Sequence, residues 1–414
     1  MTPAPAHALI RDSLDHCVKC TICETYCPVA AATPLFPGPK YVGPQAERYR
    51  VPGEGPSPDD SLDYCSSCGI CTQVCPQGVH IAEINSQARA ALKEDRGIPL
   101  RDRLITRPAL TGRLGAPVAP LANATMRSRL VRRLVERTIG VHRNAPMPRW
   151  AGRTYQARAR RGGRRRAPEP ALAERTVVYF HGCGANYYEP ETAERAVAVL
   201  EHNGLDVIVP RQGCCGLPLQ SSGVFPAARQ HVRRLASALA PYARAGHDIV
   251  ATSTSCGLML KREAREILGV EDEDLRVVGE RLYDVCEYLA LMHERGDLRT
   301  DFEEVRMDVP YHAPCQQRGH GIGTPALELM ALVPGLRARQ VDATCCGIAG
   351  AYGLKREKYE IAMAVGHPVF RQVRDSGAEL SVCDSETCRW QIAHGTGIPS
   401  VHPVELLYRA YGLG

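Results

Sequence analysis

Residues 17–28 read Cys-Val-Lys-Cys-Thr-Ile-Cys-Glu-Thr-Tyr-Cys-Pro, and residues 65–76 read Cys-Ser-Ser-Cys-Gly-Ile-Cys-Thr-Gln-Val-Cys-Pro. Both stretches place three cysteines three residues apart and add a fourth that precedes a proline. Three thiolates in this spacing can wrap one face of an iron–sulfur cube, and in two-cluster ferredoxins the fourth cysteine ligates the other cluster. The two stretches therefore predict a pair of neighbouring 4Fe–4S clusters suited to passing electrons.

Crossed ligation assigns four cysteines to each cluster. The first set is Cys17, Cys20, Cys23 and Cys75, and the second set is Cys65, Cys68, Cys71 and Cys27. The alternatives are a pair of zinc sites or clusters with a purely structural role. Zinc is disfavoured, because structural zinc usually binds two cysteine pairs separated by a longer insert.

A different cysteine pattern occurs twice in the rest of the chain, at an offset of 131 or 132 residues. Each copy has a lone cysteine, then a Cys-Cys-Gly motif, then a Ser-x-x-Cys motif. The candidate ligands are Cys183, Cys214, Cys215 and Cys256 in the first copy, and Cys315, Cys345, Cys346 and Cys388 in the second. Four soft ligands suit an iron–sulfur centre or zinc. The alternative is four buried, inert cysteines in each copy.

The patterns of secondary structure divide the chain into four parts. Short β-branched runs at residues 176–180, 206–209 and 248–252 alternate with helical stretches such as 191–202, which favours α/β units in the repeats. Residues 81–95 have helical composition. We expect an α+β multi-domain fold: a helical dicluster ferredoxin module at 1–97, a basic helical linker at 98–174, and two α/β cysteine-rich domains at 175–306 and 307–414.

Composition limits the class of protein. Eighteen cysteines in 414 residues, with no apolar signal-like stretch in residues 1–16, favour metal or redox sites in a reducing cytoplasm over a disulfide scaffold. The longest uncharged stretch in the basic segment, residues 114–126, has 13 residues and two prolines, which is too short to span a membrane.

The middle of the chain is strongly basic. Residues 98–175 contain 19 arginines, no lysine and four acidic residues, so the rest of the chain is net negative. We expect a helix at 129–139 with Leu130, Val131, Leu134 and Val135 on one side and four arginines on the other. Such a helix suits an anionic lipid surface; the alternative is packing against this chain or another protein of a complex. The arginine-rich run at 149–166 is interpreted as a linker.

Longer stretches resemble a known family. They are Pro37-Gly-Pro-Lys, Gly43-Pro, Glu47-Arg-Tyr-Arg, His181-Gly-Cys with Asn186-Tyr, Gly213-Cys-Cys-Gly-Leu-Pro, Cys345-Cys-Gly-Ile-Ala-Gly-Ala-Tyr-Gly-Leu-Lys and Ser385-Glu-Thr-Cys-Arg-Trp-Gln-Ile. The chain is similar nearly end to end to the family of C subunits of bacterial anaerobic glycerol-3-phosphate dehydrogenases. The Cys-Cys-Gly repeat alone is shared with the B subunits of heterodisulfide reductases, the glycolate oxidase iron–sulfur subunit and lactate-utilisation proteins.

The resemblance implies a role without substrate catalysis. A flavoprotein partner, with another dehydrogenase subunit, would oxidise glycerol 3-phosphate, and this chain would pass electrons to the membrane quinone and attach to the inner, cytoplasmic face of the membrane. No Gly-x-Gly-x-x-Gly follows a strand and opens a helix, so we expect no FAD or NAD on this chain. The rival hypotheses are the iron–sulfur subunit of a glycolate or lactate oxidase and a nucleic-acid-binding protein. The second is disfavoured because the arginine run has few aromatic residues.

One departure concerns the end of each repeat. In the wider superfamily the last motif is typically Cys-x-x-Cys, whereas Ser253 and Ser385 occupy its first position here. Cys383 could substitute for the ligand lost at Ser385, and Cys286 is expected in the core. His181 and His312 precede a cysteine in both repeats, and they suit either hydrogen bonding beside a bound centre or the core.

Overall fold

The computed structural model describes residues 10–50, 59–164 and 166–414. Two four-stranded parallel sheets lie in the second half of the chain, in the orders β2-β1-β3-β4 and β6-β5-β7-β8. The strands are β1 (Thr176–Phe180), β2 (Asp206–Ile208), β3 (Asp248–Ala251), β4 (Leu282–Asp284), β5 (Met307–His312), β6 (Leu336–Gln340), β7 (Ser381–Cys383) and β8 (Ser400–Val401). The two sheets have the same topology, because β1 and β5 each lie between the next two strands of their own repeat. The expected α+β fold with two repeated α/β units is confirmed.

Helices pack on both sheets and connect their parallel strands. Those of the first repeat are α11 (Gly182–Tyr187), α12 (Pro190–His202), α13 (Leu217–Ser221), α14 (Phe225–Arg244), α15 (Thr254–Leu258), α16 (Ala264–Glu266), α17 (Glu273–Glu280) and α18 (Val285–Glu294). Those of the second repeat are α19 (Cys315–His320), α20 (Pro325–Ala331), α21 (Tyr359–Asp375), α22 (Glu386–Thr396) and α23 (Pro403–Ala410).

One hydrophobic core joins the two repeats. It combines buried residues of β1 and α18 with buried residues of β5 and α23, including Tyr179, Leu289, Tyr311 and Leu407. The two tyrosines occupy equivalent positions and have equivalent partners: Tyr179 Oη lies 2.7 Å from Thr252 Oγ1, and Tyr311 Oη donates to Asp384 Oδ2 at 2.7 Å. The repeats therefore share a buried face.

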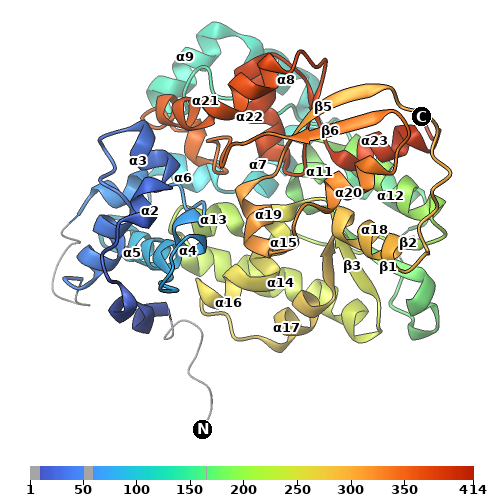
Figure 1. Ribbon diagram of the computed structural model, residues 1–414, viewed down its shortest axis with the longest axis horizontal. Helices are drawn as coiled ribbons and strands as arrows, with labels where there is room; N and C mark the ends of the chain where they lie inside the picture. Colours follow the sequence, from blue (N-terminus) through green and yellow to red (C-terminus); the bar gives the residue numbers. More distant parts are fainter. Residues whose placement is uncertain (1–9, 51–58, 165) are drawn as a thin grey trace.

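The N-terminal part is helical and lies at the opposite end of the molecule from the C-terminus (Figure 1). Its helices are α2 (Ile22–Thr25), α3 (Pro28–Ala32), α4 (Ile70–Gln73) and α5 (Ile81–Arg96). Arg89 of α5 is buried and donates to the carbonyl oxygens of Leu62, Cys65 and Ser221. Because Ser221 belongs to the first repeat, this guanidinium fixes the second cysteine loop to that repeat.

The basic middle segment is largely helical. Its helices are α6 (Leu100–Ile105), α7 (Pro108–Gly115), α8 (Ala119–Arg127), α9 (Arg129–Thr138) and α10 (Tyr155–Arg161). In the run expected to be a linker, Arg158 forms ion pairs with Glu191 and Glu194, and Arg164 forms one with Glu201. These acidic residues of α12 hold the run against the first repeat. Among the described residues, we find no helix of the length and apolarity that a membrane crossing needs.

The exposed and buried faces of helix α9 carry different residues from those expected from the sequence. Leu130 and Leu134 are 74% and 61% exposed, whereas Val135 packs beneath the helix. Arg132 turns toward the protein, where it donates to the carbonyl oxygens of Arg143 and Ala145. The outer face of α9 therefore carries two leucines together with the other arginines.

Candidate iron–sulfur sites and the cavity between them

The first cysteine group surrounds a small cavity near the N-terminus. It contains the four cysteines assigned to the first cluster: Cys17, Cys20, Cys23 and Cys75. The loop between them turns through Lys19 and Thr21, both with positive φ, which brings the side chains of Cys17, Cys20 and Cys23 to one side. The backbone N–H of Val79 donates to Cys75 Sγ at 3.4 Å. Cys20 is exposed, so this group lies at the protein surface.

The second group surrounds a separate cavity next to the first. Its cysteines are Cys27, Cys65, Cys68 and Cys71. Backbone N–H groups again point at sulfur, from Ala30 to Cys27 Sγ at 3.5 Å and from Ser67 to Cys65 Sγ at 3.4 Å. The structure thus brings together the two crossed sets. Hydrogen bonds to sulfur favour a bound anionic cluster, so the residues fit 4Fe–4S clusters, and their ligation stays a prediction.

The cysteines of each repeat lie where parallel strands end. In the first repeat, Cys183 is in α11 after β1, Cys214 and Cys215 are in the loop after β2, and Cys256 is in α15 after β3. The carboxyl ends of parallel strands meet at one edge of a sheet, which is a common place for ligands. Accordingly, Cys215 Sγ lies 3.1 Å from Cys256 Sγ, and Cys183 is hydrogen-bonded to Cys214. All four thiols are gathered at this edge.

The second repeat has the same arrangement at the ends of β5, β6 and β7. Cys315 is hydrogen-bonded to Cys345, and Cys346 to Cys388. The hydrogen bond from Cys315 is the main cause that holds the pKa of the Cys345 thiol well below its usual range, followed by the hydrogen bond from Cys346. A thiol that ionises readily is a better metal ligand, so this edge suits a metal or a cluster.

The glycine after each cysteine pair is required by the backbone. Gly216 and Gly347 have φ values of +85° and +88°, and their N–H groups donate to Cys214 Sγ at 3.4 Å and Cys345 Sγ at 3.3 Å. A Cβ atom at Gly347 would collide with the carbonyl oxygen of Ala362. Glycine therefore allows the turn that aims a backbone donor at the sulfur.

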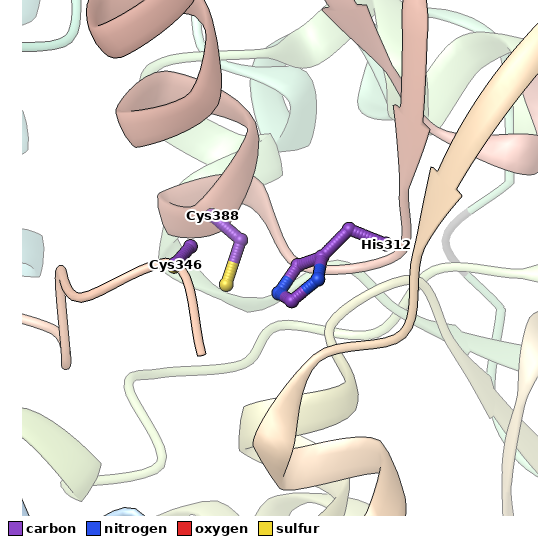
Figure 2. Close-up of side chains that lie close together, drawn as sticks. All are labelled: His312, Cys346 and Cys388. Atoms are coloured by element: carbon purple, nitrogen blue, oxygen red, sulfur yellow. The ribbon is translucent and has the colours of Figure 1, made fainter. Parts of the chain in front are cut away.

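The two repeats differ at one residue pair. Figure 2 shows His312 directed toward Cys346 and Cys388, and the candidate ligand atoms of these three residues lie within 4.8 Å of one another. The equivalent position in the first repeat is held by Phe180, which packs with Cys215 and Cys256, because the strand registers pair Phe180 with Ala251 and His312 with Cys383. His181 lies one residue further along and places Nδ1 2.6 Å from the carbonyl oxygen of Gly182. Imidazole with thiolates is a ligand set for zinc as well as for iron. The sequence suggested His312 only as a neighbour or core residue, and no local signal distinguished it from His181.

Cysteines and serines outside the two ligand sets also have defined places. Cys383 is buried and hydrogen-bonded to Cys388, which puts it beside the second repeat's group. Cys286 is buried in the shared core, as expected. Ser253 Oγ donates to Glu386 at 3.3 Å, so a carboxylate of the second repeat occupies the position next to the first repeat's thiols.

A central cavity of about 400 Å³ connects three of the cysteine groups. Its wall includes Cys68 of the second ferredoxin group, together with Cys183, Cys215 and Cys256 of the first repeat and Cys315, Cys345, Cys346 and Cys388 of the second. The middle segment contributes mainly apolar residues to the rest of the wall, such as Met126, Val135 and Met147.

The fold and these cysteine groups define an iron–sulfur protein with a dicluster module and two cysteine-rich repeats. The family model described as a 4Fe-4S dicluster domain matches residues 13–79, and the model described as a cysteine-rich domain matches residues 177–261 and 309–393. The protein is 36% identical over 401 residues to the C subunit of anaerobic glycerol-3-phosphate dehydrogenase from Escherichia coli (strain K12), covering 96% of this chain and 98% of that one. The chain belongs to this family of C subunits.

More distant relatives match only part of the chain. The B subunit of fumarate reductase (CoM/CoB) from Methanothermobacter marburgensis is 29% identical over 57% of this chain and 46% of its own length. Lactate utilization protein A 1 of Bacillus mycoides is 26% identical over 52% of this chain and 87% of its own length. The cysteine-rich architecture thus occurs in proteins named for several substrates, whereas the end-to-end match is to the glycerol-3-phosphate family.

Proposed function

We propose that this chain is the electron-transfer and membrane-anchoring subunit of an anaerobic glycerol-3-phosphate dehydrogenase. It receives electrons from a flavin-bearing catalytic subunit and delivers them to a membrane quinone. The observation that supports this most strongly is the continuous order of cysteine groups from the surface to the central cavity. Iron–sulfur clusters, where these cysteines hold them, accept and release one electron at a time.

The order of the groups rests on shared packing. Cys23 of the first group and Cys71 of the second belong to one hydrophobic cluster. Cys27 and Cys65 of the second group share another cluster with Cys345 of the second repeat. The thiols of Cys68 and Cys345 also interact electrostatically, although burial is the larger cause that raises the pKa of Cys68. The second ferredoxin group is therefore the neighbour of the cavity.

The exposed end of this series suits a docking site for the flavoprotein subunit. Val18 and Ile22 lie within the first cysteine loop and are 64% and 36% exposed. Tyr26, Leu35 and Tyr41 add further exposed apolar surface from nearby parts of the chain. Apolar and aromatic side chains grouped beside a redox group are typical of a partner interface. A further dehydrogenase subunit is part of the same proposal.

The middle segment supports attachment to the cytoplasmic face of the membrane. Helices α6 to α9 and their connections expose large apolar side chains: Leu100, Leu110, Leu114, Val118, Leu121, Leu130 and Leu134. Arg129, Arg133 and Arg137 are exposed beside the two leucines of α9. Leucines that enter the lipid interface next to arginines that meet anionic headgroups make a reversible anchor. The competing occupant of this face is another protein of the complex.

The test uses the complex with its catalytic subunit and the Cys20→Ser variant. Electron flow to quinone should stop, whereas oxidation of glycerol 3-phosphate with a dye that accepts electrons at the flavoprotein should continue. Cys286→Ala, a change at a buried cysteine outside the four groups, is the matched control and should keep both activities. Persistent quinone reduction in Cys20→Ser would refute the relay. Reduction of the chain by a glycolate or lactate flavoprotein, and not by the glycerol-3-phosphate enzyme, would favour the rival hydroxy-acid function.

A further inference from the structure

We propose that the central cavity is the site where the quinone ring binds and is reduced, and that it opens toward the lipid-facing side of helices α6 to α9. This inference rests on the proposed function and assigns its final substrate to one place. The cavity of about 400 Å³ includes the space at the thiols that a bound centre would fill, so the quinone ring is assigned to the apolar part lined by the middle segment. Three features support it: the lining chemistry, the rigid aromatic wall and the position of the opening.

The lining disfavours most soluble substrates of the redox reactions considered above. Among the described residues of its wall, none is lysine, arginine or histidine, and two, Glu263 and Glu386, are acidic. Phosphate esters and carboxylates are bound most strongly by cationic side chains, which the described wall does not supply, so it disfavours glycerol 3-phosphate and 2-hydroxy acids. A neutral, largely apolar molecule with a few hydrogen-bond acceptors fits. The hydroxyl group of Ser255, near the cysteines, suits a carbonyl oxygen of such a molecule.

Three aromatic side chains form a preorganised part of the wall, and their polar atoms are already bonded elsewhere. Trp150 Nε1 donates to the carbonyl oxygen of Thr111 at 3.1 Å, Tyr188 Oη donates to that of Pro108 at 3.1 Å, and Trp390 Nε1 donates to Glu189. The Tyr188 ring lies 5.8 Å from that of Trp390 and 6.4 Å from that of Trp150. Rings fixed in this way offer apolar surface to a flat ring without losing a hydrogen bond.

The opening lies in the segment that carries the exposed leucines. Leu104 both lines the cavity and is 37% exposed, and Leu100, one turn earlier in α6, is 69% exposed. Met126 of α8 and Val135 of α9 line the cavity from the same helices whose outer faces carry Leu121, Leu130 and Leu134. The helices that carry the exposed leucines thus also form the wall of the cavity, so an opening between them leads to the apolar surface. A ligand that is dissolved in lipid can enter here without crossing water.

The reaction assigned to the cavity balances with what the complex supplies. Quinone takes up two electrons and two protons, and both carbonyl oxygens become hydroxyl groups of the quinol. The electrons come from the two-electron oxidation of glycerol 3-phosphate at the flavoprotein partner, and the protons come from water. Cysteine groups of both repeats and of the ferredoxin module line the same cavity, so the electron donor and the acceptor are neighbours.

The experiment uses the whole complex and a photoreactive azidoquinone with a short alkyl tail, followed by peptide mass mapping. Labels are expected on the cavity-lining residues Met126 and Met147, and an excess of the unlabelled decyl quinone should abolish them. Labels confined to the exposed residues of α9, or to residues that do not line the cavity, would overturn the inference. Wild-type complex that is reduced by glycerol 3-phosphate but reduces no quinone would instead refute the proposed function.

Variants add a second readout. Met147→Trp should fill the apolar part of the cavity and lower labelling and quinone turnover by about tenfold, because the larger ring takes the space that the quinone needs. Iron content, vesicle binding and dye reduction should stay at the wild-type level. Leu121→Trp, on the exposed surface of the same segment, is the matched control and should leave labelling unchanged. Equal labelling in Met147→Trp and wild type would place the quinone elsewhere.

Discussion

Arg89 provides a sharp test of how the ferredoxin module is attached. Its side chain is 4% exposed, and its two terminal nitrogens donate to Ser67 Oγ at 2.7 Å and to the carbonyl oxygens of Ser221 at 2.7 Å, Leu62 at 3.2 Å and Cys65 at 2.5 Å. The Arg89→Met variant keeps the aliphatic stem and removes all four hydrogen bonds. Three backbone carbonyls would then lose a buried, charged partner.

The size of the effect follows from those contacts. A hydrogen bond to a charged group contributes about 1.5–3 kcal/mol, and bonds made by one guanidinium are not additive. We expect a loss of about 4 kcal/mol in the free energy of local opening of α5, which corresponds to about a thousandfold faster hydrogen exchange of its most protected amides. Hydrogen exchange by mass spectrometry on the holoprotein measures this directly and needs no reversible unfolding.

Arg96→Met is the matched control on the same helix. Arg96 makes one ion pair with Asp60, and the two side chains are 48% and 70% exposed. Exposed pairs of this kind contribute about 0–1 kcal/mol, so exchange should change by less than about fivefold. Equal protection of α5 in Arg89→Met and Arg96→Met would refute the attachment of the cysteine loop through Arg89.

Three further predictions concern the carboxylate of Asp63, the glycine Gly347 after the second cysteine pair, and the exposed leucines of helix α9. Burial alone would raise the pKa of Asp63, but Lys358, Lys93 and Arg89 lower it well below its usual range; this carboxylate therefore stabilises the folded protein above about pH 4 and loses its effect as the pH falls further. The difference in protease resistance between wild type and Asp63→Asn should be clear at pH 6 and shrink as the pH falls below about 4. Gly347→Ala should lower the metal content of the chain, because its Cβ atom would collide with the carbonyl oxygen of Ala362; Gly152→Ala, where nothing lies within 4 Å, should not, and equal metal contents would contradict this reasoning. Leu130→Ser with Leu134→Ser should weaken binding to anionic vesicles by about 150-fold, since each buried leucine contributes about 1.5 kcal/mol or more; unchanged co-sedimentation would assign this face to another protein of the complex.

The sequence predicted those features that depend on spacing along the chain. The internal offset identified the repeats, and the helix expected at 81–95 is α5 (Ile81–Arg96). The structure also gathers the crossed sets around Cys20 and Cys68 as expected. Features that depend on distant residues could not be predicted. Helical periodicity placed Arg132 of α9 among the solvated arginines. Its actual partners, the carbonyl oxygens of Arg143 and Ala145, lie beyond the end of the helix, so the periodicity could not reveal them.

The same reason explains why the cavity and the role of the arginine run were missed. The cavity wall combines residues from Ser66 to Trp390, and no local pattern relates them. The acids that pair with Arg158 and Arg164 lie 33 to 37 residues further along the chain. His312 meets Cys346 and Cys388 only because the fold brings them together. The local sequence defines which side chains can act as ligands or ion-pair partners, and tertiary packing decides which of them come together.

The shared core of the two repeats has a consequence for the history of this chain. Equivalent tyrosines, Tyr179 and Tyr311, lie in one buried face to which both sheets contribute. Two copies that bury the same face against each other describe a two-fold symmetric dimer, so duplication of a gene whose product was a homodimer, followed by fusion, accounts for the arrangement. Fusion releases each half from identity with the other. One half could then keep His312 beside its thiols while the other placed Phe180 at the equivalent position beside Cys215 and Cys256, which a symmetric dimer could never do.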